Sequence, residues 1–445
     1  MKKNYLLGMA LMASLSFNSC DKEVVYVQDG TGVESVADGA QIITLQVENG
    51  GDGLATRAGR PLYSAEAKQT IENVKLWICD GAGNVKYVTT ISNWDKDGST
   101  PYTTGGHGRQ TTIELKGADK LAAGTYKIYA VGYSNSSAYT LTDVTNVAKE
   151  STFNENMVLP CSTAGEEIFA GQMELAVEKG KGFKKPVVLN RQVAGAFAYV
   201  KDIPFMEGAK YLKLVTSAQN QSLVLGNFNS FDFTGNGSGN ANVKYVVNGT
   251  NGKSGSETYV ISTIDLNKWF TAIKDDNGDN LIDAGENWKN PCRPSSSPAA
   301  GTYPTFQKGS AFGGEFVIPF AHVDGKQTLT LQLTKEDGDS LRSWKVNLGS
   351  ADEQLKQTIT CWNSGSTNWS TSLSGESSNT YSLVRNHLYG IGTRMNDEAD
   401  PEQPGVDPDP DSENPNDKPE SLNNKQELVL KVNDNWEVIH GMELD

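Results

Sequence analysis

The chain has 445 residues, a formal net charge of -15 at pH 7, 45 glycines and a hydrophobic fraction of 37%. This length predicts about two domains. The polar, glycine-rich composition, with Val, Thr, Tyr and Trp spread throughout, favours β-sandwiches over helical bundles. The negative charge argues against nucleic acid and anionic lipid as electrostatic partners.

The N-terminus carries an export signal. Lys2 and Lys3 precede the apolar run 6–17, which is too short to span a membrane as a mature helix. The run ends at Ser19-Cys20, and a Cys in this place resembles the lipobox of bacterial lipoproteins. The resemblance implies removal of residues 1–19 and lipidation of Cys20, whose several acyl chains would anchor the precursor in the outer membrane. The alternative is an ordinary secretory signal with an incidental Cys.

Residues 20–57 are predicted to form a propeptide with one strand, 42–47. Ile43, Leu45 and Val47 alternate with polar residues and would share one face of that strand. A glycine-rich segment follows and ends at Arg57-Ala58. In such an exposed segment a trypsin-like, Arg-specific protease can thread and cut the backbone.

Two long stretches of strand pattern follow, which we predict to be an N-terminal β-sandwich domain over 58–185 and a C-terminal one over 186–395. In the first, the strands 74–79 and 85–91 enclose a short glycine-containing loop and predict a hairpin. Short connections between strands predict mostly antiparallel pairing in both domains. We expect the boundary itself somewhere between 180 and 205.

The C-terminus is a strand on a tether. Residues 396–424 are rich in Asp, Glu, Pro and Asn, so they form an extended linker. In the segment 425–445 that follows, the apolar residues fall on one side at period two; they are Leu428, Leu430, Val432, Trp436 and Val438. A lone strand is unstable in water, so this one needs a sheet to join. It can pair within its own chain or with another chain.

The sequence contains no recognisable catalytic arrangement, so we do not expect an enzyme. Its four His residues lie in no nucleophile, zinc or metal-spaced pattern, and there is no phosphate-binding glycine loop. Beyond Cys20, the cysteines Cys79, Cys161, Cys292 and Cys361 lack metal-ligand spacing, and their disulfide state stays open. Cys79 lies in an apolar strand and is expected to be a buried free thiol.

One motif points to a cation. Acids and amides recur with the spacing of a twelve-residue calcium loop, the ligands being Asp275, Asn277, Asp279, the carbonyl of Leu281, Asp283 and Glu286. Position 6 is Asn280 rather than Gly, and Asn tolerates the left-handed backbone needed there. Residues 265–273 are predicted to be a helix capped by Asp265. We therefore expect a structural Ca²⁺, with a solvated Asp/Asn/Gly turn as the alternative.

Taken together, these features resemble the Bacteroidales-type fimbrillins, the pilins of type V pili. The resemblance is carried by Cys20, by Arg57-Ala58, by the stretches 167–171, 188–194 and 381–389, and by the tethered strand with Trp436. It implies an all-β chain of two antiparallel, transthyretin-like β-sandwich domains plus a C-terminal donor strand. It also implies lipoprotein export, cutting after Arg57, and polymerisation by donor-strand exchange into a cell-surface fimbrium that serves adhesion and biofilm formation.

The physics of strand exchange is consistent with this resemblance. The strand 42–47 would complete the first sheet until the cut at Arg57 lets it leave, and the tail of another copy or a related fimbrial subunit would replace it. Burying the five apolar tail residues would contribute about 7–15 kcal/mol before ordering costs. Two other functions are considered: a lipid-retaining anchor or accessory subunit, and a surface glycan-binding lipoprotein with exposed Trp or Tyr. Trp436 is the expected anchor of the donor strand.

Overall fold

The structure is a computed structural model, and all the residues it describes belong to one compact unit, Glu34–Asp445. The described residues are 39–48, 71–101, 108–161, 166–226, 245–285, 287–291, 306–323, 329–348, 359–373, 380–393, 418–423 and 427–432. Within them the predicted all-β class is confirmed. The helical segments there are short: η1 (Gly117–Asp119), α2 (Thr142–Thr145) and α3 (Leu266–Trp269).

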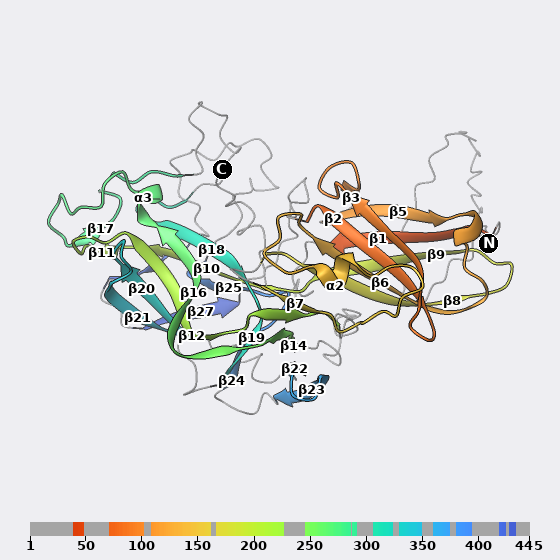
Figure 1. The fold of residues 1–445 in the computed structure, drawn as a ribbon. Helices are drawn as coiled ribbons and strands as arrows, with labels where there is room; N and C mark the ends of the chain where they lie inside the picture. The colour runs from red at the N-terminus through yellow and green to blue at the C-terminus, as the bar shows by residue number, and fades with distance from the viewer. Residues whose placement is uncertain are drawn as a thin grey trace, which may run out of the picture. The chain divides into compact units, whose positions relative to one another are not determined.

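Eight strands between Gln41 and Arg191 build the first large sheet (Figure 1). Its neighbours are antiparallel except for one parallel pair, β9 with β1. In order across the sheet the strands are β3 (Val85–Ser92), β2 (Asn73–Asp80), β6 (Gly124–Tyr133), β8 (Phe169–Val177), β9 (Phe183–Arg191), β1 (Gln41–Glu48), β5 (Gly108–Leu115) and β4 (Thr100–Pro101).

The first sheet encloses its own core because its two halves face each other. Ile43 and Leu45 of β1 belong to the same buried cluster as Leu76 of β2 and Ile128 of β6, although β1 lies several strands away from both in the sheet. Strands distant in hydrogen-bonding order can share a core only when the sheet is folded over, as in a sandwich.

The described residues from Ala194 onward build the second large sheet. In order its strands are β16 (Lys253–Asp265), β12 (Tyr211–Gln219), β20 (Leu329–Thr334), β21 (Ser340–Leu348), β27 (Glu427–Val432), β25 (Leu388–Ile391), β10 (Ala194–Lys201) and β18 (Ala311–Val317), with β26 (Glu420–Ser421) also on β10. Phe197 of β10, Leu212 of β12 and Trp344 of β21 meet in its core, so this sheet is also folded into a sandwich.

Smaller sheets complete the described fold. They are β11 (Ile203–Pro204) with β17 (Leu281–Ile282); β15 (Gly249–Thr250), β13 (Ser222–Val224) and β7 (Val158–Pro160); β14 (Tyr245–Val247), β22 (Ile359–Asn363) and β23 (Asn368–Leu373); and β19 (Phe320–Val323) with β24 (Thr380–Leu383). A third buried cluster contains Trp77 of the first sheet together with Leu159 of β7 and Leu223 of β13.

Several local predictions are confirmed. The hairpin predicted over 74–91 is formed by β2 and β3. Cys79 is a buried free thiol, and burial, followed by the charge of Asp80, raises its pKa to about 12. The helix predicted over 265–273 begins with Asp265 as its cap but ends at Trp269, so the prediction is correct at its start and too long.

The predicted boundary between 185 and 186 falls inside a strand of the first sheet. β9 runs from Phe183 through Pro186 to Arg191, and Pro186 pairs with Thr44 of β1 in the first sheet. The chain therefore passes from the first sheet to the second at Gln192 and Val193, inside the wider range expected. A proline can occupy a strand position where no ladder bond needs its missing N–H, so Pro186 did not mark a new domain. No helix in the described residues is long and apolar enough to cross a membrane.

Candidate functional site

The first candidate is β1, the strand that precedes Arg57 in the sequence. β1 pairs antiparallel with β5 from Gln41 through Glu48 and parallel with β9 from Gln41 through Val47. Ile43, Leu45 and Val47 each have 0% exposure, as their alternation predicted. The strand expected over 42–47 is therefore present as an interior strand that is hydrogen-bonded along both edges (Figure 1).

Polar contacts fix the beginning of β1. Gln41 Nε2 donates to the carbonyl of Leu121 at 2.9 Å, and Gln41 Oε1 accepts from the Leu121 amide at 2.7 Å. The amide of Phe183, where β9 begins, donates to the carbonyl of Ala40 at 2.8 Å. Removing β1 would leave these groups without partners in addition to exposing its apolar slot, so the slot needs another occupant.

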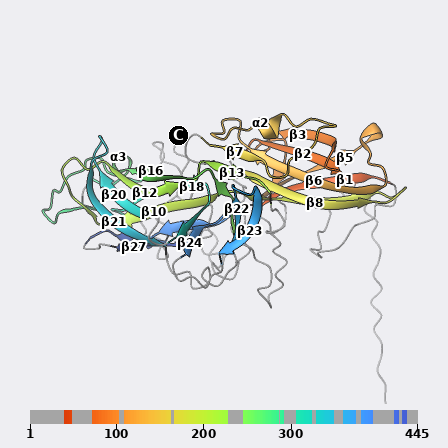
Figure 2. The ribbon, with the colours of Figure 1, turned by 60° about the horizontal axis from the view of Figure 1, so that its bottom comes forward.

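The second candidate is β27, which contains the first half of the predicted donor strand. Leu428 and Leu430 are 1% exposed, whereas Val429 between them is 40% exposed, so the predicted apolar face is the buried one. β27 pairs parallel with β21 from Glu427 to Leu430 (Figure 2). It pairs antiparallel with β25 from Leu430 to Val432 (Figure 1). Trp436 and Val438 lie outside the described residues.

This placement concerns the choice between pairing within the chain and pairing with another chain. Residues 427–432 do have a sheet in their own chain, because the seam between β21 and β25 accepts them. Glu427 adds polar contacts at the start of the strand: its Oε2 accepts from Asn347 Nδ2 at 3.1 Å, and Oε1 lies 3.6 Å from Lys345 Nζ. Of the two possibilities that the sequence leaves open, pairing within the chain is the one the structure contains for this segment.

β1 and β27 have the same kind of neighbours. Each lies between one parallel strand, β9 or β21, and one antiparallel strand, β5 or β25. Each also buries alternate aliphatic side chains on one face. A strand that fits one of these positions therefore matches the hydrogen-bond pattern and the side-chain alternation of the other.

The predicted calcium loop adopts its expected turn. Asn280 has a φ of 64°, the left-handed conformation predicted at that position. Asp275 accepts from the amides of Gly278 at 2.7 Å and Asn280 at 2.9 Å, and Asp279 accepts from the Leu281 amide at 2.8 Å. Asp283 accepts from the Gly285 amide at 2.7 Å. Among the described residues no three His, Cys, Asp or Glu side chains cluster for a metal, and Glu286 lies outside them.

Other predicted site residues also lie beyond what the structure describes. Cys20, Arg57 and Ala58 all fall in ranges it leaves out. Lipidation and cutting at these positions therefore remain predictions from the sequence.

Sequence reasoning missed a buried ion pair beside β9. Arg191 and Glu167 are both 0% exposed, with Arg191 Nε 2.6 Å and Nη2 2.5 Å from Glu167 Oε1. Burial lowers the pKa of Arg191, and the charge and hydrogen bond of Glu167 oppose that shift. The sequence did contain a signal for this pair, because Glu167 precedes the apolar start of β8 and Arg191 ends β9.

A second buried guanidinium, that of Arg385, lies in the turn between β24 and β25. Arg385 Nη1 donates to Gln192 Oε1 at 2.9 Å and to the carbonyl of Gly226 at 3.0 Å, while burial lowers the pKa of Arg385 well below its ordinary value. Asn386 donates its amide to the carbonyl of Val193, and His387 is buried. The stretch 385–387 thus packs at the passage from the first sheet to the second.

The described residues define an all-β protein with two folded sheets, each containing one interior strand from near an end of the chain. No family model matches this chain, and no curated protein matches it. Among solved structures it is similar to a fimbrial assembly protein from Parabacteroides distasonis, at 12% identity and a TM-score of 0.37, covering 82% of this chain and 94% of the other.

Two further solved structures are similar at the same level. The fimbrial anchor protein Mfa2 from Porphyromonas gingivalis has 11% identity and a TM-score of 0.31, with 74% of this chain and 94% of the other covered. A putative adhesin from Bacteroides thetaiotaomicron has 12% identity and a TM-score of 0.35, with 77% and 95% covered. These three similar structures are described as two fimbrial proteins and a putative adhesin.

Proposed function

We propose that this chain is a structural subunit of a cell-surface fimbria that polymerises by donor-strand exchange and serves adhesion. The observation that carries the proposal is the position of β1. This strand is an interior part of the first sheet, yet Arg57 separates it in sequence from β2 and every later strand. One cut there would turn an integral strand into a peptide held only by non-covalent contacts.

The consequence of that cut follows from the contacts of β1. Its three fully buried aliphatic side chains contribute about 5–9 kcal/mol of gross burial energy, from which the cost of ordering the strand is subtracted. When the cut peptide dissociates, β5 and β9 expose unpaired edges and an apolar slot. Such an edge is filled most readily by another strand of alternating pattern.

The proposed donor is the C-terminal strand of another copy, with Leu428, Leu430, Val432, Trp436 and Val438 facing the slot. β27 already pairs with one parallel and one antiparallel neighbour. In the β1 slot it would again have one parallel neighbour, β9, and one antiparallel neighbour, β5. The Pro- and acid-rich residues 396–424 give it reach. The tail of one copy in the first sheet of the next is a heterologous contact that does not close, so it produces a fibre.

Export as an outer-membrane lipoprotein through Cys20 belongs to the same proposal, as does cutting after Arg57 by a trypsin-like, Arg-specific protease.

The loop from Asp275 to Glu286 is proposed to hold a structural Ca²⁺ through carboxylate and carbonyl oxygens, which are the ligands this ion prefers. A lipid-retaining anchor or accessory subunit is the nearest alternative, and it would need no cut at Arg57.

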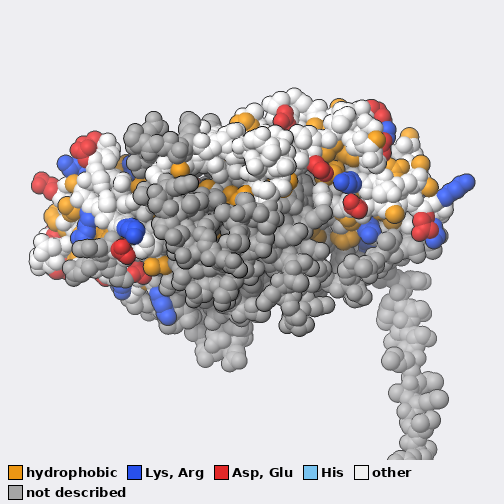
Figure 3. All heavy atoms as spheres, turned by 90° about the horizontal axis from the view of Figure 1, so that it is seen from below, with side chains coloured by type: hydrophobic (Ala, Val, Ile, Leu, Met, Phe, Trp, Pro, Cys, Tyr) orange, Lys and Arg blue, Asp and Glu red, His pale blue; other side chains and the backbone are white. Residues whose placement is uncertain are grey.

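Binding of a glycan through an aromatic platform is less favoured. Every Trp and Tyr whose side chain the structure describes is buried or half-buried. Figure 3 shows one face on which the described Lys, Arg, Asp and Glu side chains are interspersed. The described surface on this face therefore resembles that of a soluble structural subunit more than a sugar-stacking site.

The proposal is tested by cutting the chain that begins at Cys20 with an Arg-specific protease. We expect ladders that resist SDS on gels and whose subunits begin at Ala58. The double variant Arg57→Ala/Arg60→Ala should give no ladder, whereas Arg60→Ala alone should behave like wild type. Ladders from the uncut double variant would refute release of β1 as the trigger.

A further inference from the structure

The two large sheets repeat one topology. Seven strands of the first sheet correspond, in chain order and in pairing, to seven of the second; the pairs are β1 with β10, β2 with β12, β3 with β16, β5 with β18, β6 with β20, β8 with β21, and β9 with β25. The single parallel contact between the first and last strands recurs, as β1 with β9 and as β10 with β25. The sheets can therefore be compared position by position.

In this comparison β27 has no counterpart in the described part of the first sheet. It lies in the second sheet between β21 and β25, and the matching place in the first sheet is between β8 and β9. β27 thus shows how a strand is received at that position: parallel to the strand on one side and antiparallel to the strand on the other.

The strands β8 and β9 separate soon after they meet. They pair at two positions, Phe169 with Arg191 and Ala170 with Asn190. At Gly171 a Cβ atom would lie 2.0 Å from the carbonyl oxygen of Val188, so the strands are in close contact there. Beyond that point Met173–Val177 pairs with β6 on one edge, and no described strand pairs with its other edge. We call Met173–Val177, together with the facing edge of β9, the β8–β9 seam.

We propose that the β8–β9 seam binds residues 433–445 of a second copy of this chain. The proposal rests on the self-association inferred above but assigns it an additional site. The site differs from the β1 slot, because β1 lies on the opposite side of β9. A strand that binds there therefore does not compete with β1 for its place in the sheet.

The tail has the pattern that the seam requires. Four of its residues, Trp436, Val438, Met442 and Leu444, keep the parity of Leu428 and Leu430, which are the buried residues of β27; Asp434 and His440 have the same parity and interrupt the apolar pattern. The four apolar residues can therefore face the core along with Leu175 and Val177 of β8. β27 keeps its own place, so the tail binds without a strand first being displaced.

Charge favours the same pairing. On its other face the tail carries the acids Glu437, Glu443 and Asp445. The turn between β8 and β9 carries Lys179 and Lys181, and Lys185 follows in β9. Glu178, which is 2.6 Å from Lys181, offsets part of this positive charge. The second sheet offers a precedent at the start of β27, where Glu427 lies near Lys345. Exposed ion pairs contribute little affinity, so these charges should affect the association rate of the tail more than its affinity for the seam.

Hydrogen exchange tests the seam directly. The chain from Cys20 is used in the Arg57→Ala/Arg60→Ala background, so that β1 stays attached, and exchange of the amides of Met173–Val177 is followed. We expect their exchange to slow about tenfold at high protein concentration, or when a synthetic peptide of residues 433–445 is added to dilute protein. Trp436→Asp should abolish the concentration effect. Asn435→Asp adds the same charge on the opposite face and should leave that effect intact.

Two results would overturn the proposal. One is exchange at Met173–Val177 that responds to neither concentration nor peptide. The other is protection that is independent of concentration yet lost in Trp436→Asp, which would place the tail in its own chain. If the cut chain forms no SDS-resistant ladder but the uncut chain still shows concentration-dependent protection, the proposed strand exchange is refuted. The proposed binding at the β8–β9 seam is then still supported.

Discussion

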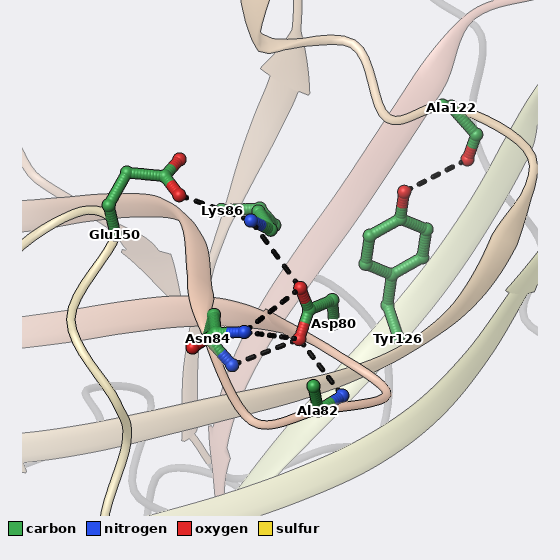
Figure 4. A network of polar contacts seen from close by, with 7 residues as sticks. All are labelled: Asp80, Ala82, Asn84, Lys86, Ala122, Tyr126 and Glu150. Atoms are coloured by element: carbon green, nitrogen blue, oxygen red, sulfur yellow. Dashed lines mark hydrogen bonds and ion pairs between the residues drawn. The ribbon is translucent and has the colours of Figure 1, made fainter.

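The carboxylate of Asp80 holds the loop of the β2–β3 hairpin. Its Oδ1 accepts from the amides of Ala82 at 2.9 Å and Asn84 at 3.0 Å, and Lys86 lies 3.4 Å from Oδ2 while also contacting Glu150 (Figure 4). The pKa of Asp80 is lowered below its ordinary value of 3.8, chiefly by the backbone hydrogen bond from Asn84. The hydrogen bonds of the folded hairpin therefore favour the charged form of the Asp80 side chain.

Because the pKa of Asp80 is lowered in the folded state, the effect of Asp80→Asn on stability should depend on pH. A carboxyl group whose pKa is lower in the folded state contributes its full stability above the unfolded pKa and loses it as the pH falls through the folded value. The melting temperature of wild type should exceed that of Asp80→Asn by a constant margin from pH 7 to about pH 5, and the margin should narrow below about pH 4. Asp97→Asn removes an exposed carboxylate outside this hairpin loop and is the control for the loss of one negative charge.

A larger loss of stability is expected when the buried ion pair of Glu167 and Arg191 is broken. Removing the carboxylate in Glu167→Ala leaves the Arg191 charge in a fully buried site, and breaking such pairs costs about 3–5 kcal/mol. Urea unfolding measures the loss. Glu178→Ala breaks the exposed pair with Lys181 nearby and should cost less than about 1 kcal/mol. Similar losses in the two variants would contradict a burial-dependent role.

At the level of elements, Gly171 determines how closely β8 approaches β9. A Cβ there would lie 2.0 Å from the Val188 carbonyl oxygen and 2.8 Å from its carbon, both backbone atoms that cannot rotate away. Gly171→Ala should therefore force the strands apart and cost about 1–3 kcal/mol in denaturant unfolding. At Gly124 a Cβ would lie 3.6 Å from its nearest neighbour, an ordinary contact, so Gly124→Ala is the control and should be nearly neutral.

The calcium loop is tested by binding rather than by geometry. If Asp275 supplies a ligand, Ca²⁺ at about 100 times its dissociation constant should stabilise the chain by about 2.7 kcal/mol, and EDTA should reverse the gain. Asp275→Ala should abolish the response in thermal unfolding. Asp276→Ala removes the neighbouring acid, which occupies a non-ligand position, and should retain it. An unchanged melting temperature on adding EDTA to the wild-type chain would rule out the ion.

The sequence predicted elements best where alternation alone determines the fold. Ile43, Leu45 and Val47 identified β1 and its buried face, and Leu428 and Leu430 did the same for β27. What each strand pairs with was not predictable, because alternation specifies a face but not a neighbour. The ion pair of Glu167 and Arg191 was missed for the same reason, since its two charges meet only when β8 and β9 are in place.

At the scale of the whole molecule, the topological repeat clarifies the two roles of the C-terminus. Residues 427–432 complete the second sheet, in which Leu428 and Leu430 are buried, whereas the residues after Val432 lie beyond that sheet's described strands. In the uncut chain, the support that β27 gives its own sheet and the proposed contact of residues 433–445 with the β8–β9 seam should therefore be separable by truncation at two neighbouring points, one on either side of β27.

A chain ending at Val432 should unfold at the same urea concentration as the complete chain when dilute. A chain ending at residue 426 should lose about 4 kcal/mol or more, because two buried leucines and the ladder bonds of β27 go with it. Both should lose concentration-dependent protection of Met173–Val177, the first with its fold intact. If the chain ending at Val432 is as unstable as the shorter one, residues 433–445 support their own subunit, and the separation of roles fails.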